Sequence, residues 1–464
     1  MNVEQFVNQG LGNSSYLVVS QAAHVAAVVD PLRDVDRYRE AARRLGVDIT
    51  HILDTHLHAD FVSGARELAA QTGAVIGASV DAGLRFDHKP LTEGDDIRVG
   101  DFTLETVSTP GHTPEHISFV LRSPEGGKPK AIFSGGALIP GGAARTDLLG
   151  PELAEPLARR LFGTIRGKFL SLPDDTRVYP THGGGSFCIA SPVGDRTTTI
   201  GLERRRNPLV RSRTEDEFVR LALTGLPSYP PYFHQMRAIN REGPKVLGGV
   251  PDLPPRSARE VRDLIAGGVA VLDVRPARAF VAGHIPESYG IDVGLGLAPW
   301  AGWLVPFGTP LVLVTLGVDD RDEAVRELIR IGYDDLRGYL DGGVNGWHSA
   351  GLPVESFPRV SVRELHKRVT SDDPPAILDV RFNAEWEDGH IRGAVHVEAG
   401  RLPSGELPLP KDRTIAAHCV HGIRSAAALS VLARRGYRDL VLIDGGVQEW
   451  ATAGFDVGTG TDGA

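Results

Sequence analysis

The feature that most restricts how this 464-residue chain can fold is an internal repeat in its second half. Val271-Leu-Asp-Val-Arg275 returns as Ile377-Leu-Asp-Val-Arg381, and each copy is followed by Gly-His-Ile and, later, by Asp-Gly-Gly. Within both copies short apolar runs alternate with helical patterns, which is typical of a parallel sheet covered by helices on both faces. The repeat therefore predicts two α/β domains of one kind, over residues 256–353 and 359–458.

The first half of the chain follows another plan, with many glycines and alternating short strands and helices. Apolar runs predict strands at residues 16–19, 25–30, 49–53, 102–107, 117–121 and 131–133. Proline clusters at residues 227–231 and 251–255 mark a boundary, because proline interrupts helices and strands. We therefore expect one α/β domain over residues 1–245 and a linker over residues 246–255.

The second copy of the repeat carries a cysteine in a loop that favours the thiolate form. Cys419-Val-His-Gly-Ile-Arg424 lies between a predicted strand and a predicted helix. A cysteine before a helix N-terminus faces unpaired N–H groups and the positive end of the helix dipole, and both stabilise a thiolate. Gly422 permits a tight loop, and Arg424 adds positive charge for an anionic sulfur donor such as thiosulfate. Cys419 is therefore expected to be a nucleophile.

These motifs resemble the rhodanese family of sulfurtransferases throughout the repeat. In that family the cysteine of a Cys-x-x-Gly-x-Arg loop carries a persulfide sulfur from a donor to an acceptor. The resemblance implies that role for Cys419, assisted by Gly422 and Arg424. The first copy has Thr315 at the corresponding place and then two aspartates, whose charges would repel an anionic donor. We expect no sulfur transfer there, and a structural or docking role for that copy.

Histidines gather at the ends of predicted strands in the first half of the chain. The run His56-Leu-His58-Ala-Asp60 follows an apolar strand, and His112 and His182 follow other strands. Neutral imidazole and carboxylate groups are common metal ligands. The sequence therefore predicts one metal site, either Fe(II) or Zn(II), built from these five side chains.

This arrangement resembles the metallo-β-lactamase superfamily over residues 1–245, and in its details the persulfide dioxygenases that are fused to rhodanese domains. The resemblance implies an αββα sandwich and one Fe(II) that oxidises a low-molecular-weight thiol persulfide with O₂ to give sulfite. Two positions depart from the pattern. Phe61 replaces a clustered histidine, and Gly136 replaces the aspartate that the resemblance places in an iron triad with His56 and His112.

Three interpretations of this domain stay open. A dioxygenase needs a substitute for the missing carboxylate, and the candidates are water or one of the side chains Glu115, His116 and Asp147. His56, His58 and His112 would alternatively suit a single Zn(II) with an open position, as in a hydrolase of the thioesterase kind. A domain with neither activity would only bind or carry persulfide.

The second cysteine, Cys188, lies shortly after His182 on a glycine-rich loop. It is interpreted as a small buried residue, and the alternative is a thiol that receives sulfur near the metal. Two distant cysteines cannot form a disulfide framework, and an isolated reactive thiol suits a reducing compartment. We expect a cytoplasmic protein.

The charge and hydropathy of the chain limit the classes of partner that it is expected to bind. The net charge of −9 argues against nucleic acid, which needs a basic face. No apolar run approaches the ~20 residues that span a bilayer, and residues 1–16 do not resemble a secretory signal. The expected partners are thus a thiol persulfide, such as that of glutathione or coenzyme A, with thiosulfate or sulfite. The oligomeric state stays open, a homo-oligomer included.

Overall fold

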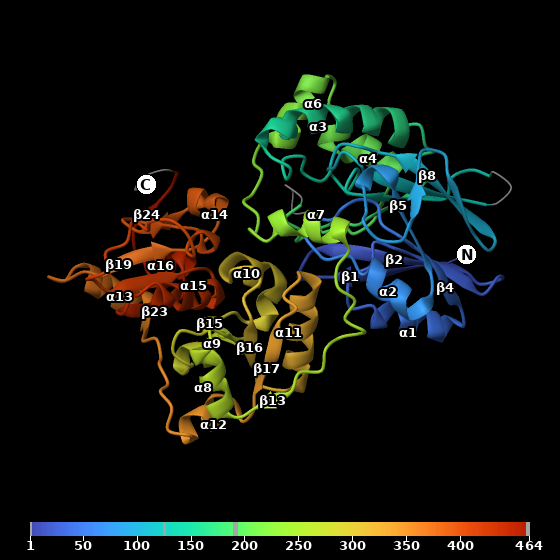
Figure 1. The fold of residues 1–464 in the computed structure, drawn as a ribbon. Helices are drawn as coiled ribbons and strands as arrows, with labels where there is room; N and C mark the ends of the chain where they lie inside the picture. The colour runs from blue at the N-terminus through green and yellow to red at the C-terminus, as the bar shows by residue number, and fades with distance from the viewer. Residues whose placement is uncertain (1, 124–126, 189–193, 461–464) are drawn as a thin grey trace. The chain divides into compact units, whose positions relative to one another are not determined.

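Two compact units make up the computed structural model, which describes residues 2–123, 127–188 and 194–460. Unit 1 comprises Met1–Pro251 and Ile329–Gly332, and unit 2 comprises Asp252–Leu328 and Tyr333–Ala464 (Figure 1). Among the described residues no helix is long and apolar enough to cross a membrane. The narrower domain boundaries that the sequence suggests stay predictions.

Unit 1 is built on two six-stranded sheets. Across the first sheet the order is β1 (Asn2–Asn8), β2 (Asn13–Ser20), β3 (Val25–Val29), β4 (Asp48–Leu53), β5 (Val75–Ser79) and β6 (Lys89–Leu91). Across the second it is β12 (Thr198–Thr199), β11 (Arg177–Pro180), β10 (Ala131–Gly135), β9 (Ile117–Arg122), β8 (Phe102–Ser108) and β7 (Asp96–Val99). Strands β3 to β6 pair in parallel, and β7 to β10 pair antiparallel.

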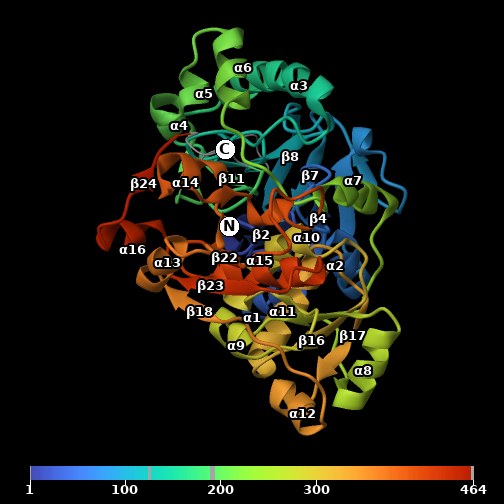
Figure 2. The ribbon, with the colours of Figure 1, turned by 90° about the vertical axis from the view of Figure 1, so that its left-hand side faces the viewer.

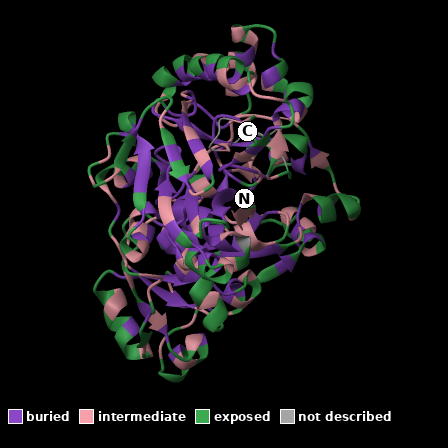
Figure 3. Cartoon of the chain, turned by 90° about the vertical axis from the view of Figure 1, so that its right-hand side faces the viewer, coloured by how far each residue is buried: buried purple, intermediate pink, exposed green. Residues whose placement is uncertain are grey.

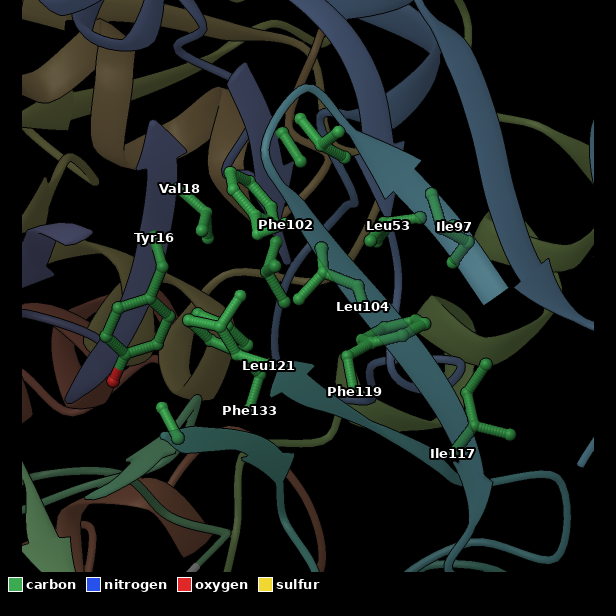
Figure 4. Close-up of a cluster of buried hydrophobic side chains, with 14 of the residues drawn as sticks. Tyr16, Val18, Leu53, Ile97, Phe102, Leu104, Ile117, Phe119, Leu121 and Phe133 are labelled. Carbon is green, nitrogen blue, oxygen red and sulfur yellow. The ribbon is translucent and has the colours of Figure 1, made fainter. Parts of the chain in front are cut away.

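An apolar core joins the facing surfaces of these two sheets. Successive side chains of a strand point to opposite faces, so alternate residues of each strand enter the core. Figure 4 shows Tyr16, Val18, Leu104, Phe119 and Phe133 among them, and all five are fully buried. Burying each such side chain stabilises the fold by roughly 1.5–3 kcal/mol.

Helices cover the outer faces of both sheets. The first sheet is covered by α1 (Asp36–Leu45) and α2 (Ala65–Thr72). The second is covered by α3 (Pro151–Thr164), the π-helical turn Ile165–Phe169, α4 (Ile200–Arg206), α5 (Pro208–Arg211) and α6 (Glu215–Leu223). Figure 3 shows buried strands inside and exposed outer surfaces on the helices. These layers confirm the predicted αββα sandwich, to which α7 (Phe233–Glu242) is added.

Unit 2 contains two five-stranded sheets whose strands all pair in parallel. The first has the order β13 (Pro255–Arg256), β17 (Leu336–Leu340), β16 (Leu311–Val314), β14 (Ala270–Asp273) and β15 (Tyr289–Gly290). The second has the order β18 (Arg359–Ser361), β23 (Leu440–Asp444), β22 (Ile415–His418), β19 (Ala376–Asp379) and β21 (Val395–His396). The strand order is the same in both, which confirms the two predicted α/β folds with parallel sheets.

Helices complete both copies of the repeat. The first copy has α8 (Ala258–Ala266), α9 (Ala277–Ala282), α10 (Leu297–Leu304), α11 (Val318–Arg330) and α12 (Gly343–Ser349). The second has α13 (Val362–Val369), α14 (Asn383–Asp388), α15 (Ile423–Arg434) and α16 (Val447–Thr452), with a small antiparallel pair of β20 (His390–Ile391) and β24 (Val457–Gly458). In Figure 2, α15 lies beside β22 and β23, and the contacts of this helix agree.

The Leu-Asp-Val-Arg motif makes the same hydrogen bonds in both copies. Arg275 holds Asp273 through Nε and Nη2 and donates to the carbonyl of Gly283 at 2.7 Å. Arg381 holds Asp379 in the same way and donates to the corresponding carbonyl, also at 2.7 Å. Pairing offsets the cost of burying these charges. The motif therefore supports the fold whether or not a copy carries a cysteine.

Candidate functional site

Three histidines from separate loops of unit 1 come together at the ends of its strands. His56 follows β4, His112 lies between β8 and β9, and His182 follows β11. One ring nitrogen of each lies within 4.8 Å of those of the other two, and all three side chains are buried. The backbone joins these loops, since Ile117 N–H donates to the carbonyl of Thr55 at 2.9 Å. The group could hold a metal ion.

The other two predicted ligands lie beside this group. His58 and Asp60 form a second candidate group with His182, again within 4.8 Å. His58 Nε2 lies 3.2 Å from an oxygen of Asp30. Asp60 accepts a hydrogen bond of 2.9 Å from the Asn13 amide. The structure thus brings all five predicted residues together but divides them between overlapping groups.

The histidines of the site differ in the direction in which their pKa values are shifted. Burial, together with the neighbouring imidazoles, holds the pKa of His56 well below its usual value. Burial and then His182 lower the pKa of His112 to about 3. Burial also acts on His58, but the carboxylate of Asp30 outweighs it and raises the pKa of His58. His56 and His112 are therefore neutral at pH 7, which is the form that binds a metal.

The two departures from the sequence pattern are both visible in the structure. Phe61 is fully buried and stacks on His58, with ring centroids 4.1 Å apart. At Gly136 a Cβ atom would lie only 2.5 Å from Cδ2 of His112. The imidazole of His112 therefore occupies the space that a side chain at position 136 would need.

The side chains considered as substitute ligands have other partners. Glu115 forms a bidentate ion pair with Arg237, with distances of 2.8 and 2.9 Å. Asp147 forms one with Arg145, with two distances of 2.7 Å. His116 Nε2 accepts a 3.0 Å hydrogen bond from the backbone N–H of Gly136. The residues present therefore fit one divalent ion held by imidazoles, and they do not fit a triad of two histidines and one carboxylate.

A cavity of about 540 Å³ opens beside the histidines. Its lining includes Leu57, Ala59 and Thr113, which alternate with or adjoin the predicted ligands. It also includes a wall of Tyr229 and residues of α7, among them Phe233, His234 and Arg237. Sequence reasoning missed this wall because it interpreted the proline clusters only as marks of a domain boundary. The aromatic run Tyr-Pro-Pro-Tyr-Phe-His was the available signal.

In unit 2 the backbone shapes the loop around Cys419. Cys419 directly follows β22, and Gly422, with φ of +81°, begins the turn into α15. This positive φ suits glycine, because other L residues are strained there. The Gly422 N–H donates to Cys419 Sγ at 3.2 Å, and Ser425 Oγ lies 3.5 Å from the same sulfur. The sulfur thus accepts a backbone hydrogen bond at the start of the helix, next to a serine hydroxyl.

Arg424, predicted to assist Cys419, has a partner in the structure that the sequence did not predict. Its guanidinium forms a bidentate ion pair with Glu385 of α14, with distances of 2.6 and 2.8 Å. Burial alone would raise the pKa of Glu385, but Arg424 outweighs it and holds that pKa below its usual value. The positive charge of Arg424 is therefore paired with a carboxylate, and its role toward an anionic donor stays a prediction. The sequence missed Glu385.

The first copy lacks the corresponding loop. Thr315 directly follows β16, as Cys419 follows β22. The next residues are open to solvent, with Leu316 64% and Val318 57% exposed. In the second copy a Cβ at Gly446 would lie 2.3 Å from the carbonyl oxygen of Cys419, whereas its counterpart at Gly343 would lie 3.9 Å from that of Thr315. Only the second loop is held tightly against its Asp-Gly-Gly segment.

Known proteins resemble both parts of the chain. The model of the metallo-beta-lactamase superfamily matches residues 9–182, and the model of the rhodanese-like domain matches residues 257–350 and 361–453. The persulfide dioxygenase ETHE1 of Homo sapiens is 31% identical over 211 residues, which cover 45% of this chain and 74% of that protein. The chain belongs to the metallo-beta-lactamase superfamily. Two rhodanese-like domains follow its metallo-beta-lactamase domain.

Other members of the superfamily extend this likeness. The hydroxyacylglutathione hydrolase of Polaromonas sp. is 37% identical over 173 residues, covering 37% of this chain and 62% of that protein. A crystal structure of a metallo-beta-lactamase from Staphylococcus aureus superposes with a TM-score of 0.66 at 31% identity, covering 73% of this chain and 98% of that one. Members with oxidising and with hydrolytic names are thus both similar to the first domain.

Proposed function

We propose that this chain is a two-site enzyme of sulfur metabolism. The metal domain, over residues 1–245, would oxidise a low-molecular-weight thiol persulfide, and the rhodanese domain at 359–458 would transfer sulfane sulfur through Cys419. The observation that carries the second activity is the Gly422 N–H donated to Cys419 Sγ before α15. The domain at 256–353 would have a structural role, because Thr315 takes the place of the nucleophile.

The chemistry proposed for Cys419 is a displacement at sulfur. Its thiolate attacks the outer sulfur of thiosulfate, the S–S bond of the donor breaks, and sulfite leaves with the bonding electron pair. The persulfide that forms on Cys419 passes the same sulfur atom to an acceptor such as cyanide, which regenerates the thiolate. Gly422 and the helix N-terminus stabilise the anionic sulfur throughout.

The metal domain contributes a buried ligand set and a neighbouring cavity. The five predicted ligands lie in two overlapping groups, from which one ion would be held, with Fe(II) or Zn(II) as the candidates. When bound, a redox-active ion such as Fe(II) supplies the one-electron chemistry that O₂ requires. The 540 Å³ cavity, lined by residues next to the histidines in sequence, has the size of a site for a small molecule such as a thiol persulfide. Both cysteines are free, which agrees with a reducing, cytoplasmic location.

Two measurements test this proposal. Fe(II)-loaded protein is expected to consume O₂ with glutathione or coenzyme A persulfide and to release sulfite. Absence of O₂ uptake with either substrate contradicts the dioxygenase activity. For the rhodanese domain, Cys419→Ser should abolish sulfur transfer from thiosulfate to cyanide, whereas Cys188→Ser should retain it. Full activity of Cys419→Ser contradicts the assignment of the nucleophile.

Hydrolysis is the second candidate for the metal domain, because a hydroxyacylglutathione hydrolase is among its relatives and three imidazoles suit Zn(II). Zn(II)-loaded protein would then cleave glutathione thioesters without O₂. The carrier alternative predicts neither reaction, only binding of persulfide. Assays with Fe(II)-loaded and Zn(II)-loaded protein separate the three.

A further inference from the structure

The protons of His56, His112 and His182 can be placed from their hydrogen-bond partners. His112 Nδ1 lies 2.6 Å from the carbonyl oxygen of Arg145, and a carbonyl can only accept, so Nδ1 carries the proton. His56 Nδ1 lies 2.8 Å from Thr55 Oγ1. That hydroxyl donates its own proton to Asp30 at 2.9 Å, so it accepts from His56.

The same reasoning applies to His182. Its Nδ1 lies 3.2 Å from Asn13 Oδ1 and 3.3 Å from Asp60 Oδ2, and both atoms are acceptors. The Asn13 amide is oriented by its NH₂ group, which donates to Asp60. Nδ1 of His182 therefore carries its proton. With Nδ1 protonated, the neutral form of each ring has its lone pair on Nε2.

These three lone pairs converge on one place. His56 Nε2 and His182 Nε2 are 3.3 Å apart, and His112 Nε2 is buried without a protein partner. Two Nε2 atoms that both lack a proton cannot hydrogen-bond to each other, and a metal ion between them would satisfy both lone pairs. Imidazole nitrogens about 2.1 Å from one tetrahedral ion lie roughly 3.4 Å apart. The observed separation matches that geometry.

His58 and position 136 do not complete the set. His58 Nε2 is turned to Asp30, and among the described residues His58 groups with Asp60 and His182 rather than with His56 and His112. The space for a carboxylate at Gly136 is filled by the ring of His112. The loss of a ligand at Gly136 is therefore balanced from another loop.

We propose that Nε2 atoms of His56, His112 and His182 bind one divalent metal ion, with His182 supplying the third ligand that Gly136 cannot. This inference rests on the metal-dependent part of the proposed function and names its ligands. Three imidazole ligands would add no negative charge to the coordination shell of the ion. Such a centre favours an anionic ligand, and a persulfide anion is one.

A pair of matched variants tests the ligand set. After loading with Zn(II) or Co(II) and exhaustive dialysis, the metal content of His182→Ala should fall at least tenfold below that of the wild-type protein, and His58→Ala should retain the ion. The opposite pattern, with the ion lost in His58→Ala and kept in His182→Ala, overturns the proposal. The d–d absorption of the Co(II) protein gives a second reading, which should be lost in His182→Ala and kept in His58→Ala.

Gly136→Asp provides an independent test, because it restores the carboxylate that the sequence pattern lacks. If His182 is the third ligand, Gly136→Asp should not increase the metal affinity. It should lower the melting temperature, because the new Cβ would lie 2.5 Å from the His112 ring. Tighter metal binding by Gly136→Asp contradicts the proposal. Circular dichroism of every variant identifies misfolding, and His182→Gln, which keeps a side chain of similar reach, replaces His182→Ala if the latter is unfolded.

The outcomes also separate this inference from the proposed activity. A wild-type protein that binds no metal overturns both the ligand set and the oxidation. A reversed variant pattern overturns the ligand set alone. The expected pattern without O₂ uptake supports the ligand set and contradicts only the dioxygenase.

Discussion

The two cysteines of this protein are expected to have different roles because different groups surround their sulfur atoms. Both cysteines are buried, and each is 1% exposed. Burial and the nearby Asp60 carboxylate raise the pKa of Cys188 well above its usual value. Cys419 instead accepts the N–H of Gly422. Because the two thiols are equally buried, the raised pKa of Cys188 is expected to make it the slower of the two to react.

This difference predicts selective alkylation of the native protein. At pH 8 iodoacetamide should modify Cys419 at least tenfold faster than Cys188, because the thiolate is the reacting form. Mass spectrometry of the digested protein measures both rates. The unfolded protein is the control, in which both thiols should react at similar rates. Faster modification of Cys188 in the native state contradicts the interpretation of it as a small buried residue.

The ion pair of Glu385 and Arg424 predicts a dependence of stability on pH. The pKa of Glu385 lies below its ordinary value of 4.5, so its charged form stabilises the native state. Glu385→Gln should lower the free energy of unfolding by roughly 1–2 kcal/mol at pH 7. That contribution is complete above pH 4.5 and is lost as the pH falls through the lower pKa of the folded state.

Urea denaturation of wild type and Glu385→Gln at pH 7 and pH 3 measures this effect. The difference between the two proteins should shrink at the lower pH. Glu364→Gln on α13 is a matched control, because Glu364 pairs with Arg368 at an exposed site within one helix. A difference that stays constant with pH would mean that the loss is not electrostatic.

At the scale of elements, the Cys419 loop is held from behind by the segment after β23. Gly446 approaches the carbonyl oxygen of Cys419 so closely that a Cβ would lie 2.3 Å from it. Backbone at this distance cannot move aside without displacing the loop. The second glycine of Asp-Gly-Gly is therefore a positioning residue for the nucleophile.

Gly446→Ala is expected to lower the free energy of unfolding by about 1–3 kcal/mol. It should reduce sulfur transfer by up to roughly 100-fold, because it displaces the reacting sulfur. Gly343→Ala in the first copy is the matched control; its φ of +56° makes it mildly destabilising, and sulfur transfer should be unchanged. Unchanged sulfur transfer in Gly446→Ala contradicts the role of positioning.

Elements were the level at which the sequence was most informative. Short apolar runs predicted the positions of β2, β3, β4, β8, β9 and β10 in unit 1, and the repeat predicted the two parallel sheets of unit 2. The sequence could not reveal that Arg424 pairs with Glu385, which is 39 positions away, or that Asn13 orients His182 from 169 positions away. Periodicity reports which face of an element is buried, but the partner of a polar side chain depends on the assembled fold.

At the scale of the whole molecule, the two units differ in their optical signals. All five tryptophans of the chain lie in unit 2, at Trp300, Trp303, Trp347, Trp386 and Trp450. Tryptophan fluorescence therefore reports the unfolding of unit 2 alone. Circular dichroism reports both units, because both contain helices and strands.

This distribution predicts that metal stabilises one transition only. An ion at 100 times its dissociation constant should stabilise unit 1 by about 2.7 kcal/mol. Thermal unfolding followed by circular dichroism should therefore shift upward on adding Zn(II), while the fluorescence transition should stay in place. The His182→Ala variant is the control without a shift. Movement of the fluorescence transition by the metal would show that the units unfold together.

The ligand set also shows why a single missing residue was difficult to interpret from the sequence. Gly136 marked the loss of a carboxylate, and Glu115, His116 and Asp147 were reasonable replacements because they lie near the other ligands. In the structure each of these three side chains binds another group of the protein. His182 is among the predicted ligands, but its convergence with His56 depends on the packing of β4 and β11, which no local pattern encodes.

The burial of Cys419 has a consequence for the fate of stored sulfur. A persulfide on a side chain that is 1% exposed is screened from its surroundings. Cyanide and sulfite are small enough to reach it with little rearrangement, whereas a peptide thiol such as glutathione must displace part of the loop. The loop would then act as a sieve. Abundant bulky thiols would then accept the persulfide sulfur slowly, and the size of the acceptor would decide which molecule receives it.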